Sequence, residues 1–239
     1  MDSAYLAEIA HEALGAGAAM ILADSPSIPR SEVADAERVA RERGWNFTKI
    51  ATSEFENEAF LKNDGTRCYF CKSELFTKMD QYAREHGIRV LAYGEIADDR
   101  LDPTRVGARA AKEHQVVAPL ADAGLHKEEI RELSRRRGLP TAEKASFACL
   151  SSRFPIGTRV DLTEMQKIEQ AEEILKAQGF HQYRARHHGD ICRIEVDPAD
   201  IPRLLDPLVR APLASQIRAL GYKHVTLDLL GYRTGSTAS

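Results

Sequence analysis

The chain has 239 residues, of which 43% are hydrophobic, and a formal net charge of -3. This length and apolar content suffice to bury a core, and they allow one large or two small domains. The near-neutral charge gives no electrostatic case for nucleic acid as a partner. The longest apolar stretch, at 18–23, is too short for a signal peptide or a membrane span, so we expect a cytoplasmic protein with reduced thiols.

Helical and strand patterns alternate as far as about residue 140. Apolar periodicity and capping signals predict helices at 4–14, 31–43, 71–86, 107–113 and 127–137. Continuous apolar runs predict strands at 18–24, 45–51, 89–93 and 116–118. Such an alternation is typical of a parallel sheet with helices on both faces, so we expect an α/β fold. Ligands in folds of this class bind at the carboxyl ends of the strands.

The pattern changes after the loop at 154–160. Thr163 and Gln166 resemble a capping box, which predicts a helix that stops at Gly179. Strands are predicted at 180–187, 191–196 and 223–229, with a helical stretch at 207–220. The sequence therefore predicts two domains, an α/β domain at 1–153 and an α+β module at 154–239.

Three cysteines are candidates for one site. Cys68 and Cys71 form a C-x-x-C pair within Arg67–Lys72, and Cys149 lies in Ala148–Arg153. A structural zinc normally takes four protein ligands, whereas three thiolates can hold an iron-sulfur cluster and leave one iron open. That open iron can carry an exogenous ligand such as sulfide.

Other interpretations of these cysteines remain open at this stage. The C-x-x-C pair is also typical of a redox pair or of half a zinc site, with Cys192 or the pair His187 and His188 as further ligands. Cys149 could be a core residue, although the polar residues 151–153 beside it suit a site better. Cys192 lies in an alternating run, which predicts a small apolar residue in a sheet.

Two polar segments follow predicted strands directly. Asp24–Ser27 lies where a nucleotide would bind, or it is an ordinary turn between a strand and a helix. In Gly94–Asp99, the adjacent carboxylates of Asp98 and Asp99 suit Mg²⁺ that bridges phosphates. The alternative for this second segment is a solvated acidic loop.

Arg184 and Arg186 are two residues apart on a predicted strand, so their guanidinium groups point to one face, roughly 7 Å apart. Such a pair can bind a phosphate or a carboxylate. The alternative is a solvent-facing charged stripe, which the adjoining polar residues 187–190 disfavour.

Five segments together resemble the LarE family over nearly the whole chain. They are Asp24–Ser27, Arg67–Lys72, Ala148–Arg153, Arg184–Asp190 and Leu227–Arg233. Members of this family are PP-loop (adenine nucleotide alpha hydrolase-like) pyrophosphatases and ATP-dependent sulfur transferases, and they make the nickel-pincer cofactor of lactate racemase. They adenylate a carboxylate of pyridinium-3,5-biscarboxylic acid mononucleotide, release pyrophosphate and replace the activated oxygen with sulfur.

The resemblance implies the cofactors and the assembly. Some members give up the sulfur of a cysteine matched by Cys149, whereas others with three cysteines resemble carriers of a 4Fe-4S cluster that delivers sulfide. With Cys68, Cys71 and Cys149, this chain resembles the second kind. We therefore expect ATP, Mg²⁺ and a 4Fe-4S cluster as cofactors, and an external sulfur donor whose identity the resemblance does not give. We also expect a homo-oligomer such as a hexamer.

The resemblance also assigns roles to residues. The catalytic and cluster-binding residues would be Cys68, Cys71 and Cys149. The phosphate of the substrate would be bound by Arg184, Arg186, Ser152 and Arg153. ATP would be bound by Asp2, Ser3, Asp24, Ser25, Pro26, Gly94, Asp98 and Asp99.

The chain departs from the family pattern in two places. The family's pyrophosphate loop reads Ser-Gly-Gly-x-Asp-Ser after a strand, and only Asp2 and Ser3 match it. We therefore expect an N-terminal truncation that removes the first strand and most of the loop; Ser3 could alternatively cap the first helix. Glu95 and Ile96 stand where PP-loop proteins commonly have Thr-Asn. The rival functions are a PP-loop tRNA thiolase and a truncated, non-catalytic binding protein.

Overall fold

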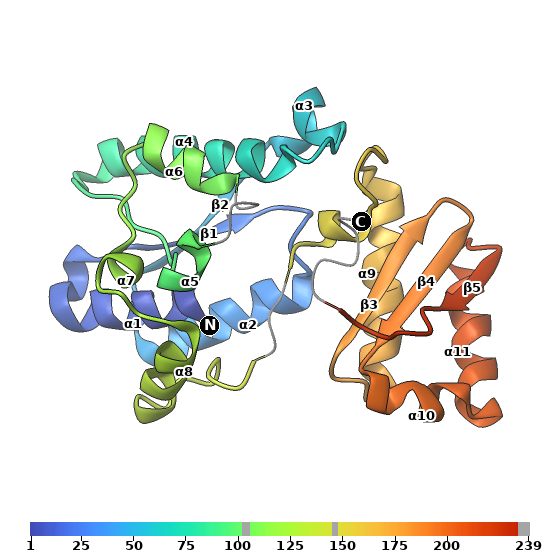
Figure 1. Cartoon of the computed structure of the whole chain (residues 1–239). Helices are drawn as coiled ribbons and strands as arrows, with labels where there is room; N and C mark the ends of the chain where they lie inside the picture. The colour runs from blue at the N-terminus through green and yellow to red at the C-terminus, as the bar shows by residue number, and fades with distance from the viewer. Residues whose placement is uncertain (102–105, 145–147, 234–239) are drawn as a thin grey trace. The chain divides into compact units, whose positions relative to one another are not determined.

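The computed structural model describes residues 1–101, 106–144 and 148–233 (Figure 1). The chain divides into two compact units, of which unit 1 comprises Met1–Phe60 and Thr66–Ser146, and unit 2 comprises Leu61–Gly65 and Phe147–Ser239. This division falls a few residues before the predicted boundary after Arg153. The difference has a physical cause, because Arg153 forms a buried ion pair with Glu172 of unit 2.

The first part of the chain is mainly helical around short parallel strands. Its strands are β1 (Met20–Asp24) and β2 (Phe47–Ala51). Its helices are α1 (Asp2–Leu14), α2 (Arg30–Arg43), α3 (Glu58–Leu61), α4 (Arg67–His86), α5 (Ala97–Arg100), α6 (Gly107–Glu113), α7 (Pro119–Asp122) and α8 (Lys127–Arg136). Short 3₁₀ helices cover Gly15–Gly17 and Glu54–Glu56.

Strands β1 and β2 pair in parallel, with Met20 opposite Phe47 and Asp24 opposite Ala51. The α/β class expected from the sequence is confirmed. The predicted strands at 89–93 and 116–118 are not strands among the described residues but meet in one parallel bridge between Ala92 and Val117. Two backbone hydrogen bonds of 2.9 and 3.0 Å join these segments, which is too few for a regular ladder.

Apolar clusters of described residues stabilise unit 1, and two of them are clear. One joins α1, α7 and α8 through Tyr5, Leu120 and Ile130, and Trp45 packs against it. The other joins α4 and α6 through Phe76 and Ala110. Burial of such side chains contributes about 1.5–3 kcal/mol for each large residue. Unit 1 therefore has its own core.

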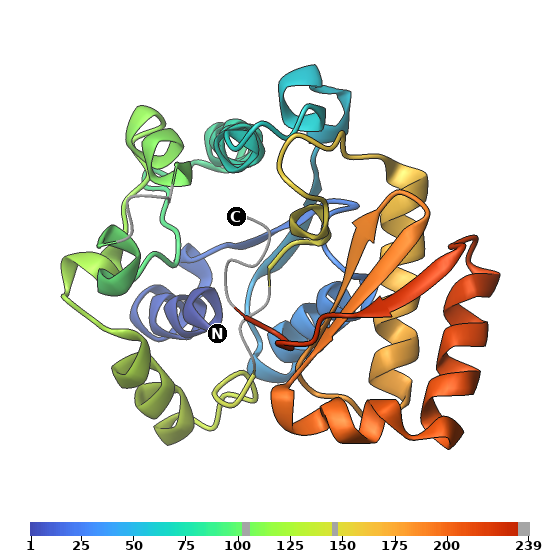
Figure 2. The same ribbon diagram turned by 45° about the vertical axis from the view of Figure 1, so that its right-hand side comes forward.

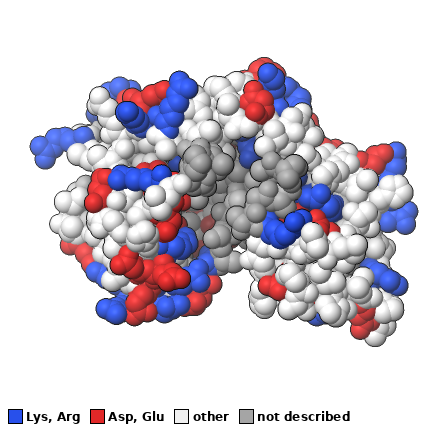
Figure 3. Space-filling view, in the orientation of Figure 1, with Lys and Arg blue, Asp and Glu red and all other residues white. Residues whose placement is uncertain are grey.

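Charged residues of both signs cover the outside of α8, as Figure 3 shows on the lower left. Glu132 pairs with Arg135 at 3.3 Å and with Arg136 at 2.9 Å, and Arg135 also pairs with Glu143 at 2.5 Å. Exposed pairs of this kind contribute little stability, typically about 0.2–1 kcal/mol each. They do neutralise the charge of this helix locally.

Unit 2 contains a three-stranded sheet in the order β3-β4-β5. The strands are β3 (Tyr183–His188), β4 (Ile191–Val196) and β5 (His224–Leu227), and β3 is antiparallel to β4 whereas β5 is parallel to it. The helices are α9 (Leu162–Ala177), α10 (Ile201–Leu205) and α11 (Pro207–Ala219), with 3₁₀ helices η3 (Leu150–Arg153) and η4 (Pro198–Asp200).

The sheet of unit 2 has one apolar face and one polar face. Ala185, Cys192 and Ile194 point to the apolar face, where α9 and α11 pack against them. Figure 2 shows both helices on the same side of the three strands. Arg184 and Arg186 alternate with these residues along β3, so they point to the other face. The alternation read from the sequence is confirmed.

Helix ends in the structure agree with the sequence at some positions and differ at others. Gly44 ends α2 in the left-handed region with φ of 67°, as glycine readily does. The N-cap of α9 is Asp161, whose carboxylate accepts hydrogen bonds from the backbone of Thr163 and Glu164. The capping box predicted at Thr163 is therefore wrong, because a better acceptor stands two residues earlier. Ser3 lies inside α1, so it does not cap that helix.

No helix among the residues described combines the length and the apolar character that a membrane crossing requires.

Candidate functional site

The carboxyl ends of β1 and β2 are joined by a buried polar contact. Ser25, directly after β1, is 3% exposed, and its hydroxyl donates to the carboxylate of Glu54, which follows β2. The backbone N–H of Ser27 donates to Ser25 Oγ at 3.0 Å. Asp24 accepts a hydrogen bond from Arg30 at 2.6 Å, while Pro26 lies exposed at the turn. The turn predicted for nucleotide binding is thus fixed by side-chain contacts.

Glu54 is a candidate residue that the sequence analysis missed. Glu54 is 2% exposed, and its second carboxylate oxygen, Oε2, is buried without a hydrogen-bond partner among the residues that the structure describes. A buried carboxylate oxygen is a strong acceptor, and leaving it unpaired is costly. An acidic residue shortly after the end of a predicted strand is the signal that could have identified it.

The start of α1 lies against Gly94. A Cβ atom at Gly94 would come within 2.7 Å of the backbone nitrogen of Ser3 and 2.8 Å of its Cα. Asp2 forms an ion pair with Lys127 at the start of α8, with its two oxygens 2.7 and 2.9 Å from Nζ. Gly94 is therefore brought against Asp2 and Ser3, from which it is far apart in sequence, within unit 1.

Asp98 and Asp99 make local hydrogen bonds. Asp98 accepts from the backbone N–H of Lys127 at 2.7 Å and lies 3.0 Å from Nδ1 of His126. These contacts, with His126 first, lower the pKa of Asp98, and the same contact raises the pKa of His126. Asp99 accepts from the backbone of Ile96 at 3.3 Å. Asp98 thus joins the segment after Gly94 to the start of α8, where Lys127 also forms its ion pair with Asp2.

Cys68 and Cys71 lie in the first turns of α4, which begins at Arg67 rather than near residue 71 as predicted. Their spacing of three residues places both thiols on one face of the helix. Cys68 is exposed and Cys71 is half-buried. None of the four cysteines of the chain, all of which lie in the described ranges, forms a disulfide.

Cys149 belongs to unit 2, at the start of the 3₁₀ helix η3. It is half-buried, and its carbonyl oxygen accepts a hydrogen bond from the backbone of Ser152 at 2.9 Å. Arg153, at the end of the same short helix, is fully buried. Its guanidinium forms a bidentate pair with Glu172 on α9, at 2.7 and 3.0 Å. The loop that carries Cys149 is therefore attached to α9.

Arg184 and Arg186 are buried, with 7% and 4% of their area exposed, so the alternative of a solvent-facing stripe is wrong. Arg186 pairs with the buried carboxylate of Glu195 through two hydrogen bonds of 2.9 and 3.1 Å. Arg184 lies 4.8 Å from the ring centroid of Tyr232. Burial, and then the positive charge of Arg153, lower the pKa of Arg184.

The segment after β5 covers the polar face of this sheet. The backbone of Tyr232 donates to the carbonyl of Val196 at 2.7 Å, and Asp228 lies 3.7 Å from Arg193. Among the described residues of β3, β4 and this segment up to Tyr232, the arginines outnumber the carboxylates. The arginines are Arg184, Arg186 and Arg193, and the carboxylates are Glu195 and Asp228. This excess of positive charge favours an anion at the face.

Cys192 and His187 lie on the opposite, apolar side of the sheet. Cys192 is fully buried, and burial raises the pKa of its thiol to about 12. The prediction that it is a core residue is confirmed. His187 packs against Phe154 and lies 3.3 Å from the hydroxyl of Tyr222, and burial lowers its pKa.

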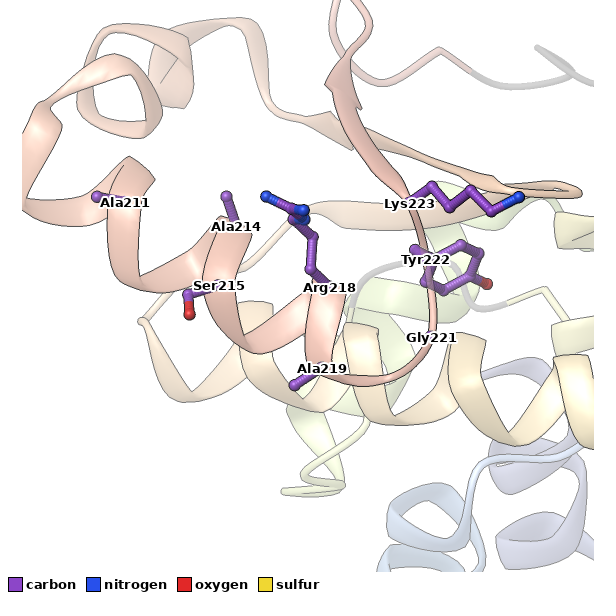
Figure 4. A pocket seen from close by; sticks show the side chains of 8 residues that line it. All are labelled: Ala211, Ala214, Ser215, Arg218, Ala219, Gly221, Tyr222 and Lys223. Atoms are coloured by element: carbon purple, nitrogen blue, oxygen red, sulfur yellow. The ribbon is translucent and has the colours of Figure 1, made fainter.

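A pocket lies beside α11 (Figure 4). Small side chains, two cationic ones and one tyrosine line it, namely Ala211, Ala214, Ser215, Arg218, Ala219, Gly221, Tyr222 and Lys223. None of the predicted site residues is among them, so the candidate site rests on the clusters described above.

Comparisons with known proteins place the chain in a family. It is 36% identical to the uncharacterized protein slr1717 of Synechocystis sp. over 235 residues, which are 98% of this chain and 87% of that protein. It is 29% identical to the pyridinium-3,5-bisthiocarboxylic acid mononucleotide synthase of Lactiplantibacillus plantarum, LarE, over 98% of the chain and 84% of that protein. No family model matches the chain.

A third relative, the uncharacterized protein MJ0830 of Methanocaldococcus jannaschii, is 25% identical over 177 residues, which are 74% of this chain and 68% of that protein. The chain belongs to the same family as slr1717, and it is similar to the LarE synthase over nearly its whole length.

The contact between Gly94 and the start of α1 can be tested by a small substitution. Gly94→Ala places a methyl group against the backbone of Ser3, so the backbone must shift, and we expect a loss of about 1–3 kcal/mol in the free energy of unfolding. Urea unfolding followed by the fluorescence of Trp45, which packs against the core of unit 1, measures this loss.

The matched control is Gly17→Ala, where the nearest atom to the new Cβ is Leu14 Cβ at 3.9 Å, an ordinary contact. This control should stay within about 0.5 kcal/mol of the parent. A Gly94 variant as stable as the parent would contradict the close packing of α1 against Gly94.

Proposed function

We propose that the chain is an ATP-dependent sulfur transferase that adenylates a carboxylate of pyridinium-3,5-biscarboxylic acid mononucleotide and inserts sulfur to give a thiocarboxylate. The observation that carries this proposal is the pair of buried arginines on β3, one of which donates to the loop of Cys149 through Ser152 O at 2.9 Å. If the phosphate of a substrate were bound there, the rest of that substrate would be held near the loop that carries the thiol of Cys149. The similarity to the synthase of Lactiplantibacillus plantarum supports this choice of substrate.

Arg184 and Arg186 would bind the phosphate of the mononucleotide. The guanidinium group presents several donors in a fixed geometry that matches phosphate oxygens. Ser152 would add a hydroxyl from the neighbouring loop. Arg153 is directed to Glu172 and to its own loop, so we assign it to holding the site rather than to direct contact with the phosphate.

ATP would bind in unit 1 at the carboxyl ends of the strands. Ser25 and Pro26 follow β1, and Gly94 lies against Asp2 and Ser3. Asp98 and Asp99 would hold Mg²⁺ on the phosphates, since hard cations prefer carboxylate oxygens, and Asp24 would contribute to nucleotide binding at the end of β1.

Adenylation explains why ATP is needed. A carboxylate is a poor electrophile because its negative charge repels nucleophiles, and attack of its oxygen on the α-phosphate of ATP gives an acyl adenylate and pyrophosphate. Groups that stabilise the developing charge on the phosphates lower the barrier of this step. Sulfur then displaces AMP from the activated carbonyl carbon, provided that a thiolate or sulfide lies within reach.

The cysteines fit the ligand type of an iron-sulfur cluster. Cys68 and Cys71 lie on one face at the exposed start of a helix, and Cys149 is half-buried in a loop, so all three offer accessible thiols. No three His, Cys, Asp or Glu side chains in the described ranges form a preassembled metal site, so this proposal rests on the chemistry of the thiols. A bound 4Fe-4S cluster would supply sulfide at its open iron.

The proposed reaction can be tested directly. The chain with ATP, Mg²⁺ and pyridinium-3,5-biscarboxylic acid mononucleotide should release pyrophosphate only when the mononucleotide is present, and mass spectrometry should find sulfur in the product. Binding of the mononucleotide without pyrophosphate release would favour a non-catalytic binding protein. Pyrophosphate release that depends on tRNA would favour a tRNA thiolase instead.

The role of the β3 arginines predicts a specific loss of affinity. Arg184→Gln removes a charge-assisted contact to the phosphate, so mononucleotide binding should weaken by about 1.5–3 kcal/mol while the affinity for ATP stays nearly unchanged. Isothermal titration calorimetry measures both. Arg184 is the better first choice because Arg186 also pairs with the buried Glu195.

Arg210→Gln is the matched control, since Arg210 lies exposed on α11. Equal affinities for the mononucleotide in the Arg184 variant and in the parent would rule out a phosphate contact at this arginine.

The cluster predicts a pattern among the four cysteines. Anaerobic reconstitution with iron and sulfide should give one cluster in the parent, detected by visible absorption and iron content. Cys68→Ala, Cys71→Ala and Cys149→Ala should each abolish it, because three thiolates are needed. Cys192→Ala should retain it, since Cys192 is buried in the core of unit 2.

Protein purified without oxygen that contains stoichiometric zinc and takes up no iron would contradict the cluster and favour a zinc site.

A further inference from the structure

The backbone of the Cys149 loop is held by one buried side chain. Arg153 Nη1 donates to the carbonyl oxygens of Ala148 at 2.7 Å and of Cys149 at 3.2 Å, and to Ser152 Oγ at 2.9 Å. The guanidinium is fully buried. One of these acceptors belongs to Cys149 itself, so the direction of its side chain depends on a group four residues further along the chain.

Glu172 connects this arginine to the sheet. Its Oε1 accepts from Arg153 Nε and also from the backbone N–H of Ala185 at 3.1 Å, while Oε2 accepts from Arg153 Nη2. Ala185 lies between Arg184 and Arg186 on β3. A single carboxylate therefore joins the loop of Cys149, helix α9 and the strand of the two arginines.

A second connection runs through Arg186. Its Nη1 donates to the carbonyl oxygen of Ser152, while Nε and Nη2 pair with Glu195. Glu195 is fully buried and also accepts from Arg193 at 3.0 Å. The orientation of Arg186 is thus fixed on one side by Glu195 and on the other by the loop.

We propose that Arg153 and Glu172 are positioning residues that fix the thiol of Cys149 beside the anion-binding strand β3. The pair does not contact the reacting atoms. The pair holds the backbone of the loop close enough to β3 for Arg186 to reach the carbonyl oxygen of Ser152. The catalytic meaning of this arrangement rests on the proposed function, but the arrangement itself can be tested without substrate.

A purely structural role for the pair is the alternative. Removing one partner of a buried ion pair leaves the other charge without compensation, which destabilises a protein whatever its function. A useful experiment must therefore separate opening of the loop from unfolding of unit 2. The four cysteines provide this separation, because they lie in three different places: the start of α4, the start of η3 and strand β4.

The experiment measures how fast iodoacetamide alkylates each cysteine in Glu172→Gln and in the parent, by mass spectrometry of the peptides. Cys149 reports on the loop, and the fully buried Cys192 reports on the core of the same unit. Cys68 and Cys71, in unit 1, serve as internal standards. We expect the rate at Cys149 to rise on the order of tenfold, because the loop opens more often, while Cys192 stays protected.

Two results would overturn the proposal. One is an unchanged rate at Cys149 with Cys192 protected, which would mean that the pair does not hold the loop. The other is a parallel rise at Cys149 and Cys192, which would mean that the pair stabilises unit 2 as a whole and has no specific effect on the thiol.

Two further variants sharpen the result. Glu173→Gln is the matched control, because the neighbouring Glu173 is about half exposed and its ion pair with Lys176, at 3.8 Å, lies at the surface. It should leave all four rates within about twofold of the parent. Arg153→Lys keeps the buried positive charge, but a single ammonium group cannot bond Glu172 and the loop carbonyls at the same time as the guanidinium does. This variant should therefore raise the alkylation rate at Cys149 alone.

The alkylation rates depend on neither ATP nor the mononucleotide. A failure of the proposed reaction would therefore leave the result at Cys149 interpretable, and an unchanged rate at Cys149 would leave the proposed reaction standing.

Discussion

Two buried guanidinium groups are each paired with a buried carboxylate, and these two pairs organise unit 2. Arg153 and Arg186 are almost inaccessible to solvent, and Glu172 and Glu195 neutralise them through bidentate hydrogen bonds. Because these contacts require fixed distances, they set the positions of the loop of Cys149, of α9 and of both strands of the hairpin. Replacing such pairs by apolar residues is often neutral for stability. Their presence here is better explained by the geometry that they impose on one face of the sheet.

Unit 1 uses polar contacts in a different way. Its contacts join segments that follow strands or begin helices: Ser25 with Glu54, Asp2 with Lys127, and Asp98 with the backbone at the start of α8. The carboxyl ends of strands and the amino ends of helices are where α/β folds bind nucleotides, since backbone N–H groups are directed there. Glu54 Oε2, which accepts no hydrogen bond from the described part of the chain, adds a buried acceptor at the same end of the strands.

The sequence predicted part of the candidate site because local periodicity is visible in a single chain. The alternation around Arg184 and Arg186 correctly placed both on one face of β3, and the apolar pattern of Ile191–Val196 gave β4 its observed bounds. The partners of these arginines could not be predicted. Glu172 lies on a helix with an ordinary amphipathic pattern, and nothing local distinguishes it from the exposed Glu173.

By itself, the sequence determined the α/β class, the alternating faces of the hairpin and the identity of the chemical groups, because these follow from residue type and from periods of two and 3.6 residues. Only the tertiary structure decided that Gly94 lies against Ser3, that Arg153 holds the loop of Cys149 and that Glu172 reaches the backbone of Ala185. These contacts join residues far apart in the chain or depend on complete burial. Burial and long-range pairing are set by how whole elements pack, which no local pattern encodes.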